Sequence, residues 1–375
     1  MKILVDDRIP FIKGALEPVA EVLYLPGDRI GPGEVKEADA LIIRTRTKCN
    51  AHVLKDSKVK FIATATIGFD HIDTSFCEAS GIHWQNAPGC NAKSVEQYIL
   101  SALLTLAEKK QFELAGKTIG IVGVGHVGSK IERVCKLLGM NVLLNDPPRA
   151  RSEGADTFVS LKQVMQDADI ITLHVPLSIS GEDSTWHFIN HLFFSSLRKK
   201  TILINSSRGE VVDSFALKHA IHSGILDSVV LDVWENESLI DLELLWRVNI
   251  ATPHIAGYSV DGKANGTKMS VQGVSEFFQL GLDDWEPKGL PVPEKTEILI
   301  DSTEKNLQQI IYEAVIASYN ILEDDKRLRD SVNTFERQRG SYPVRREFDS
   351  FSVKLANDPT GAAQVLKDLG FNILN

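Results

Sequence analysis

Short apolar runs alternate with polar stretches over the first 89 residues. Each run is three to five residues long, the length of a buried strand rather than of a helix. The runs occupy residues 3–5, 21–25, 40–44, 60–64 and 82–86. Because the stretches between them can form helices, the pattern predicts an α/β fold with a mostly parallel sheet.

The same pattern restarts after Gly116. Strand-like segments lie at residues 118–122, 141–144, 169–173, 201–205, 228–231 and 248–251. Helical stretches separate them, as a doubly wound parallel sheet requires. A helix over residues 94–109 should connect the two regions, with Ser94 as its N-cap and Gln97 completing a capping box.

A third region follows a linker at residues 281–293, whose prolines at 287, 291 and 293 oppose continuous helix or sheet. It shows a strand at 297–300, a helix with apolar residues at 307, 310, 311 and 314, and alternating apolar positions at 351, 353 and 355. A short helix is expected at 362–369. We therefore predict a separate, small α+β domain over residues 285–375.

Composition fits a multidomain globular protein. The 375 residues exceed a single domain, and 43% are hydrophobic and 24% charged. The chain has 41 Lys and Arg against 50 Asp and Glu, and the net charge of -9 disfavours nucleic acid as a partner.

The four cysteines lack the spacing of a zinc site or a disulfide framework, so no metal is expected. No apolar run has the length of a signal peptide core or a membrane span. We expect a cytoplasmic protein without a membrane partner.

A glycine motif carries the first chemical signal. Gly123, Gly125 and Gly128 follow a predicted strand and open a predicted helix, the setting in which such glycines bind a dinucleotide pyrophosphate. The alternative is a chance glycine-rich turn. Asp146 lies 18 residues after the last glycine, at the end of the next strand, where a carboxylate binds adenosine ribose and favours NAD over NADP. The neighbouring Arg149 and Arg151 leave NADP open.

Three further segments, residues 205–210, 232–237 and 252–258, each follow a predicted strand of the second sheet. The carboxyl ends of parallel strands meet at one edge, so the segments should converge and bring Arg208, Glu237 and His254 together. An arginine can hold a substrate carboxylate while a histidine takes a hydroxyl proton, which suits oxidation of a 2-hydroxy acid. Alternatively, Arg208 is a surface ion-pair residue, Glu237 a solvated acid, and His254 a structural histidine.

These residues resemble the D-2-hydroxyacid dehydrogenase family over about residues 1–280. The resemblance rests on the Gly123 to Gly128 motif, the Ser206-Ser207-Arg208-Gly209 turn, the 232–237 segment and the Pro253-His254 pair. It implies two Rossmann-like domains flanking a cleft: a substrate-binding domain of residues 1–92 completed by 258–280, and an NAD-binding domain of residues 93–257. It also implies catalytic roles for Arg208, Glu237 and His254.

The resemblance further implies which side chains contact the ligands. Substrate contacts are implied at Thr45, Thr66 and Tyr258. Cofactor contacts are implied at Gly123, Gly125, His126, Val127, Gly128, Asp146, Val175, Ser206, Ser207, Arg208, Asp232 and Gly257. Independently, Arg44 and Arg46 directly follow a strand and could bind a substrate phosphate, although a solvated strand end is the simpler alternative.

Within the family, the chain length and the C-terminal region resemble the branch that oxidises a phosphorylated four-carbon 2-hydroxy acid in pyridoxal 5'-phosphate biosynthesis. That resemblance implies a homodimer formed through the C-terminal domain. A hypothesis that follows is that Arg345 or Arg346 reaches the substrate phosphate of the partner if the dimer brings this domain over the partner's cleft. A dehydrogenase for another acid, such as D-3-phosphoglycerate, remains an alternative. An NADH-sensing corepressor on the same fold is a second one.

Overall fold

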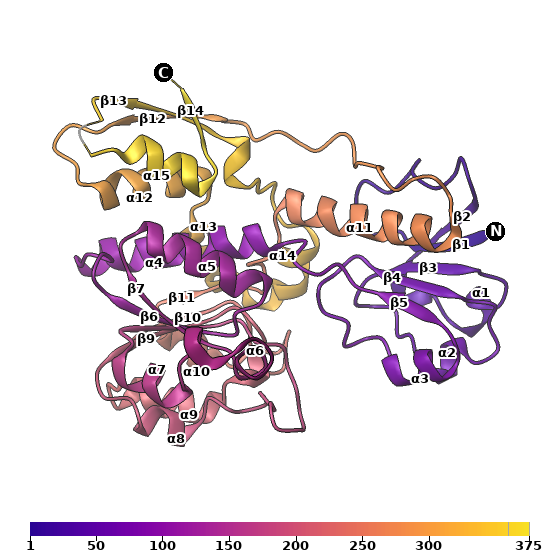
Figure 1. The fold of residues 1–375 in the computed structure, drawn as a ribbon, viewed down its shortest axis with the longest axis horizontal. Coiled ribbons are helices and arrows are strands. Elements are labelled where there is room, and N and C mark those ends of the chain that lie inside the picture. The colour runs from indigo at the N-terminus through magenta and orange to yellow at the C-terminus, as the bar shows by residue number, and fades with distance from the viewer. Residues whose placement is uncertain (359, 375) are drawn as a thin grey trace. The chain divides into compact units, whose positions relative to one another are not determined.

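The computed structural model describes residues 1–358 and 360–374 (Figure 1). By internal contacts the chain divides into two compact units. The first unit consists of Met1–Asn91 and Tyr258–Val292, and the second of Ala92–Gly257 and Pro293–Asn375. The C-terminal region, expected as a separate domain from residue 285, thus groups with the second sheet from Pro293 onward.

The first unit contains a five-stranded sheet in the order β2-β1-β3-β4-β5, and its strand pairs are parallel. Both faces of this sheet are buried, so its strands appear in the sequence as unbroken apolar runs. In β1, Leu4 packs in one core, and Ile3 and Val5 pack in the core on the other face. The strands are β1 (Lys2–Asp6), β2 (Glu21–Leu25), β3 (Ala40–Ile43), β4 (Phe61–Thr64) and β5 (His83–Gln85).

Four helices cover this sheet. The long helix α11 (Val260–Phe278) follows Gly257 of the second unit in sequence but belongs to the first unit. It contributes Val271 and Val274 to the core that contains Ile3. The opposite core takes Val35, Val53 and Cys77 from short helices. These are α1 (Pro32–Val35), α2 (Ala51–Leu54) and α3 (Thr74–Ala79).

The second unit is built on a six-stranded parallel sheet in the order β11-β10-β9-β8-β6-β7. This is the predicted doubly wound topology: β7 is added on one side of β6, and β8 to β11 are added on its other side. The strands are β6 (Thr118–Val122), β7 (Asn141–Asn145), β8 (Ile170–Leu173), β9 (Thr201–Asn205), β10 (Leu226–Leu231) and β11 (Ile250–Ala251). The α/β prediction and its strand positions are confirmed.

Helices cover both faces of this sheet (Figure 1). On one face lie α4 (Ala92–Lys110) and α5 (His126–Leu137), and α6 (Pro147–Glu153) follows β7. On the other face lie α7 (Leu161–Asp167), α8 (His191–Ser195), α9 (Ser214–His222) and α10 (Leu242–Arg247). Short 3-10 helices occupy Gly27–Arg29, Ala155–Thr157, Gly209–Val211, Val332–Thr334 and Phe348–Ser350.

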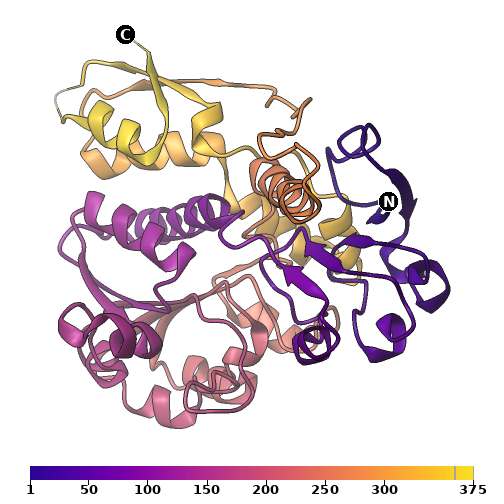
Figure 2. The ribbon, with the colours of Figure 1, turned by 45° about the vertical axis from the view of Figure 1, so that its right-hand side comes forward.

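The C-terminal region forms its own three-stranded sheet, β12-β13-β14, and its pairs are parallel. Figure 2, like Figure 1, shows α12 and α15 on one face of this sheet. Its elements are β12 (Glu297–Asp301), α12 (Leu307–Ser318), α13 (Ile321–Asp330), α14 (Phe335–Gly340), β13 (Ser352–Ala356), α15 (Ala362–Leu369) and β14 (Asn372–Leu374). Helices α12 and α13 contact α4, and α15 contacts α5.

The predicted N-cap of the connecting helix is wrong. Helix α4 begins at Ala92, and Ser94 lies inside it, fully buried. Ser94, Gln97 and Ser101 form a buried polar stripe, each 0% exposed, and bond to backbone groups from outside α4. The Ser101 hydroxyl, for example, donates to the carbonyl oxygen of Tyr319 at 3.0 Å. The capping-box residues therefore serve tertiary contacts rather than the helix end.

Candidate active site

The glycine motif forms a tight turn between β6 and α5. Gly123 has φ +87°, and a Cβ there would lie 2.6 Å from the carbonyl oxygen of His174. A Cβ on Gly128 would lie 2.2 Å from the carbonyl oxygen of Gly123. At Gly125, by contrast, a Cβ would meet nothing within 4 Å. The first and last glycines therefore allow close packing, and the middle one leaves open space at the start of α5.

That open space suits a phosphate group. Gly125 is the N-cap of α5 and offers no side-chain cap, so the amide groups of the first turn, which begins with His126 and Val127, can donate to an anion. Asp146 lies beside the turn, and its Oδ2 accepts a hydrogen bond from the Val124 amide at 2.8 Å. The residues at this edge therefore fit a bound dinucleotide.

Arg149 and Arg151, which were possible contacts for the 2'-phosphate of NADP, form ion pairs with acidic side chains. Arg149 makes an ion pair with Glu153 at 2.7 Å, and Arg151 makes one with Asp183. Asp146 is held in place through its other oxygen, Oδ1, which accepts a hydrogen bond from the Arg149 amide at 3.1 Å and caps α6. The carboxylate thus stays at the strand end where a ribose would be bound.

Further residues predicted to contact the cofactor follow β8 and β9 at the same edge. Val175, just after β8, lies against the glycine turn, with its Cγ1 2.9 Å from the position of a Cβ on Gly123. After β9, the Ser207 hydroxyl donates to Asn205 Oδ1 at 2.8 Å. The Ser206 hydroxyl is buried without a hydrogen-bond partner among the described residues. A buried hydroxyl in this state fits a polar group of a ligand.

Gly209 fixes where Arg208 lies. A Cβ at Gly209 would be 2.0 Å from the carbonyl carbon of Trp234 and 2.5 Å from the amide nitrogen of Glu235. Only glycine allows the loop after β9 to approach the loop after β10 this closely. Arg208, whose Nη1 donates to the carbonyl oxygen of Ser207 at 2.8 Å, is therefore held beside the segment that carries Glu237.

Glu237 and His254 form a hydrogen-bonded pair. His254 Nδ1 donates to Glu237 Oε2 at 2.8 Å, and the Trp234 amide donates to the other carboxylate oxygen at 3.0 Å. Burial acts to raise the pKa of Glu237, but the hydrogen bond and charge of His254 outweigh it, so the pKa lies below its ordinary value. The carboxylate orients the ring, which leaves Nε2 as the nitrogen for proton exchange.

Asp232, predicted as a cofactor contact, holds the loop of His254. Its side chain is 1% exposed. Its Oδ1 accepts hydrogen bonds from the Thr252 hydroxyl at 2.6 Å and the Ile255 amide at 2.8 Å, and its Oδ2 accepts one from the Ala256 amide at 2.8 Å. Gly257 follows directly. The structure therefore gives the carboxylate a structural task that the sequence did not indicate.

The predicted substrate residues lie in the first unit. Arg44, Thr45 and Arg46 form the turn that follows β3, and Arg44 Nη1 donates to the carbonyl oxygen of Arg8 at 3.3 Å. Thr66 follows β4, the neighbouring strand, and its hydroxyl donates to the carbonyl oxygen of Gly68 at 2.9 Å. These residues share the carboxyl edge of the first sheet.

Tyr258 begins the returning segment of the first unit. The Lys263 ammonium lies over its ring, 4.6 Å from the centroid. Sequence reasoning missed this cation, because a lysine in the first turn of a helix carries no signal by itself.

The hypothesis that Arg345 reaches a partner's substrate is wrong. Its side chain is 4% exposed, and it donates hydrogen bonds to Ser94, Gln97, Ile255 and Ala256 of its own chain. The buried polar stripe of α4, Ser94, Gln97 and Ser101, was the signal in the sequence that could have indicated a buried polar partner. The carbonyl oxygen of its neighbour Arg346 accepts a hydrogen bond from the Gln97 amide at 3.0 Å.

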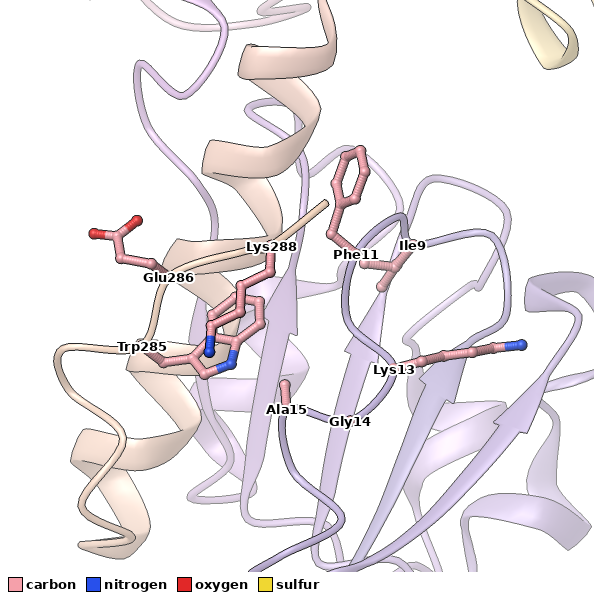
Figure 3. Close-up of a pocket in the computed structure, with 8 residues that line it drawn as sticks. All are labelled: Ile9, Phe11, Lys13, Gly14, Ala15, Trp285, Glu286 and Lys288. Carbon is pink, nitrogen blue, oxygen red and sulfur yellow. The ribbon is translucent and has the colours of Figure 1, made fainter. Parts of the chain in front are cut away.

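A pocket of about 420 Å³ in the first unit is distinct from these residues. Figure 3 shows Trp285 and Lys288, from the segment after α11, on one side of it and the loop with Phe11 and Lys13 on the other. No predicted site residue lines it.

Within residues 1–358 and 360–374, no group of three or more His, Cys, Asp or Glu is placed to hold a metal ion. No helix in this described part is long and apolar enough to cross a membrane.

Comparison with known proteins extends these observations. Residues 94–256 match the NAD binding domain of the D-isomer specific 2-hydroxyacid dehydrogenases, and residues 290–370 match a domain of unknown function. The chain is 50% identical over 357 residues to the erythronate-4-phosphate dehydrogenase of Bacteroides thetaiotaomicron, covering 94% of this chain and 99% of the relative. It is 42% identical over 372 residues to that of Porphyromonas gingivalis, covering 99% and 100%.

A solved structure agrees with the fold. D-lactate dehydrogenase from Aquifex aeolicus, complexed with NAD and lactic acid, superimposes with a TM-score of 0.61 at 26% identity. The match covers 76% of this chain and 97% of that one.

Proposed function

Since the chain belongs to the erythronate-4-phosphate dehydrogenase family, an NAD-dependent branch of the D-2-hydroxyacid dehydrogenases, we propose that it oxidises 4-phospho-D-erythronate at C2. The product is (R)-3-hydroxy-2-oxo-4-phosphooxybutanoate. The observation that carries the proposal is the 2.8 Å pair of His254 and Glu237, at the sheet edge that also presents the glycine turn and Asp146.

His254 is the general base of this proposal. Bound NAD would supply the acceptor for the hydride from C2. His254 Nε2 takes the proton of the C2 hydroxyl group. Glu237 accepts a hydrogen bond from Nδ1 and so stabilises the imidazolium that forms. Arg208 binds the substrate carboxylate and polarises the developing carbonyl group, as a guanidinium is suited to do.

Other residues hold the cofactor. The amides at His126 and Val127 receive the pyrophosphate, and Asp146 binds the adenosine ribose. The buried, unpaired Ser206 hydroxyl supports a ligand beside Val175, Ser207 and Gly257. We assign cofactor binding to all the cofactor residues that the sequence analysis names. Asp232 acts indirectly, because its carboxylate holds the loop that contains Ile255 and Ala256.

The first unit binds the rest of the substrate in this proposal. Arg44 and Arg46 meet the phosphate, and Thr45, Thr66 and Tyr258 contact the remaining substrate groups. The position of Arg44 and Arg46 directly after β3 supports this, because a parallel sheet presents its ligands at the carboxyl ends of its strands.

We also propose a cytoplasmic homodimer that serves pyridoxal 5'-phosphate synthesis. Four buried, free cysteines support a reducing compartment. Leu299, 74% exposed, lies in register with Lys354 and Leu374 on the C-terminal sheet, which supports an interface there. Light scattering of the purified protein tests the dimer, and rescue of a pyridoxine-requiring bacterial strain tests the pathway.

The decisive experiment measures NADH formation with NAD and 4-phospho-D-erythronate, beside D-3-phosphoglycerate and D-lactate, with a trap for the oxo acid. Preference for the erythronate ester by at least about tenfold in kcat/KM is expected. Preference for phosphoglycerate would keep the mechanism and refute the substrate. NADH binding without turnover of any of the three acids would favour a sensor.

A further inference from the structure

Arg345 is a buried cation that lies against the loop carrying His254. It belongs to the segment between α14 and β13, and its side chain is 4% exposed. Its Nη1 donates to the carbonyl oxygen of Ile255 at 3.2 Å, and its Nη2 donates to that of Ala256 at 2.9 Å. These are the two residues that directly follow His254.

The rest of the guanidinium is also engaged. Nε donates to Gln97 Oε1 at 2.9 Å, and Nη2 contacts the Ser94 hydroxyl at 2.8 Å. The Tyr319 ring lies 4.0 Å from the guanidinium carbon. Taking a guanidinium out of water is costly unless its hydrogen-bonding groups are satisfied, and here helix α4 and the loop supply the acceptors. The arrangement therefore suits an arginine and no other side chain.

The loop lies between two opposite charges. In the peptide that joins Ile255 and Ala256, the N–H donates to Asp232 Oδ2 at 2.8 Å and the C=O accepts from Arg345 Nη1. The two groups of a trans peptide point in opposite directions, so the carboxylate and the guanidinium hold this unit from opposite sides. Both charged groups are buried, which strengthens their interaction with the peptide dipole.

His254 itself has a backbone conformation that needs this support. Its φ is +55°, in the left-handed region, which is unfavourable for a residue with a side chain. Such a conformation persists only where the surroundings fix it. The hydrogen bond from the His254 amide to the Asp232 carbonyl oxygen, at 2.7 Å, fixes one side of the residue, and the bonds of Arg345 fix the residues after it.

We propose that Arg345 is a positioning residue for proton transfer: by holding the carbonyl groups of Ile255 and Ala256, it keeps the His254 ring where Nδ1 meets Glu237. The C-terminal region thereby contributes to the active site of its own chain. The proposal rests on the role of His254 in the proposed function, and it assigns to the C-terminal region a task beyond subunit association.

The test compares Arg345→Met and Arg345→Lys with the wild type in the full-length protein. Arg337→Met is the matched control, because Arg337 is an exposed arginine of the same region. The first readout is hydrogen exchange of the Ile255 and Ala256 amides, which needs no substrate. Exchange at least about tenfold faster in Arg345→Met, confined to this loop, is expected.

The second readout is turnover of 4-phospho-D-erythronate. We expect kcat to fall by about 10- to 100-fold while both KM values change less than about threefold. The isotope effect of C2-deuterated substrate on kcat should rise, because the chemical step becomes limiting. A merely structural role would reduce the amount of active enzyme and leave the isotope effect unchanged. Arg345→Lys, which keeps the charge but not the fork, should be intermediate, and it carries the test if Arg345→Met does not fold.

Unchanged exchange in the loop, or faster exchange with unchanged kcat, would overturn the proposal. If the wild type does not turn over the erythronate ester at all, the proposed function fails instead. In that case the exchange result, with kcat for whichever acid the wild type accepts, still decides the role of Arg345.

Discussion

Replacement of Gly209 by alanine tests whether the approach of two loops sets the catalytic geometry. The added Cβ would lie 2.0 Å from the carbonyl carbon of Trp234, whereas carbon atoms pack at about 3.5 Å. The loops must therefore separate by roughly 1.5 Å, because the obstructing atoms belong to the backbone. A displacement of about 1 Å can lower turnover about 100-fold, so a loss of at least that size in kcat is expected.

The same change should lower the free energy of unfolding by about 1–3 kcal/mol, which corresponds to roughly 2–10 °C in Tm. The assay combines steady-state NADH formation with scanning calorimetry. Gly340→Ala is the control, since a Cβ there meets nothing within 4 Å. If Gly209→Ala retained kcat within about threefold of the wild type, the close approach would not be what positions Arg208.

The remaining predictions concern single side chains. His254→Gln should lower kcat by about 10²- to 10⁴-fold while the NADH dissociation constant, measured by fluorescence, stays the same. The pKa of Glu237 is lowered in the folded protein, so the carboxylate stabilises the fold above its ordinary pKa, and this stabilisation is lost as the pH falls through the lowered value. In Glu237→Gln, the free energy of unfolding in urea should therefore decrease less steeply as the pH is lowered. Arg44→Met or Arg46→Met should raise KM for the phosphorylated substrate by about 10- to 100-fold without changing KM for NAD, as initial rates will show. Asp146→Ser should reduce the preference for NAD over NADP in kcat/KM by at least about tenfold.

The strands could be predicted from the sequence for a simple physical reason. Both large sheets are covered on both faces, so their strands read as short unbroken apolar runs, and Ala40–Ile43 and Thr201–Asn205 are fully buried. The catalytic candidates could be predicted for a related reason, because parallel topology brings the carboxyl ends of distant strands to one edge. Arg208 and His254 each follow such a strand.

The C-terminal region was harder to predict. Helix α13 has a narrow apolar stripe, because Asp324 takes a buried position in it. That carboxylate accepts hydrogen bonds from the hydroxyl groups of Tyr319 at 2.8 Å and Tyr342 at 2.6 Å, and these partners cannot be read from local periodicity. The three-residue strand Asn372–Leu374 is too short to give a pattern.

The contacts of Arg345 with the loop of His254 could not be predicted from the sequence, because the residues involved lie far apart in it. Arg345 and Ser94 are 251 positions apart, and no local rule relates them. Yet Ser94, Gln97 and Ser101 follow the spacing of one helix face and are fully buried, and a buried polar stripe requires partners. Local capping is the wrong explanation for such a stripe when a continuous helix extends past it. A polar stripe of this kind therefore indicates that a distant segment docks there, and in this chain that segment also holds the loop of His254.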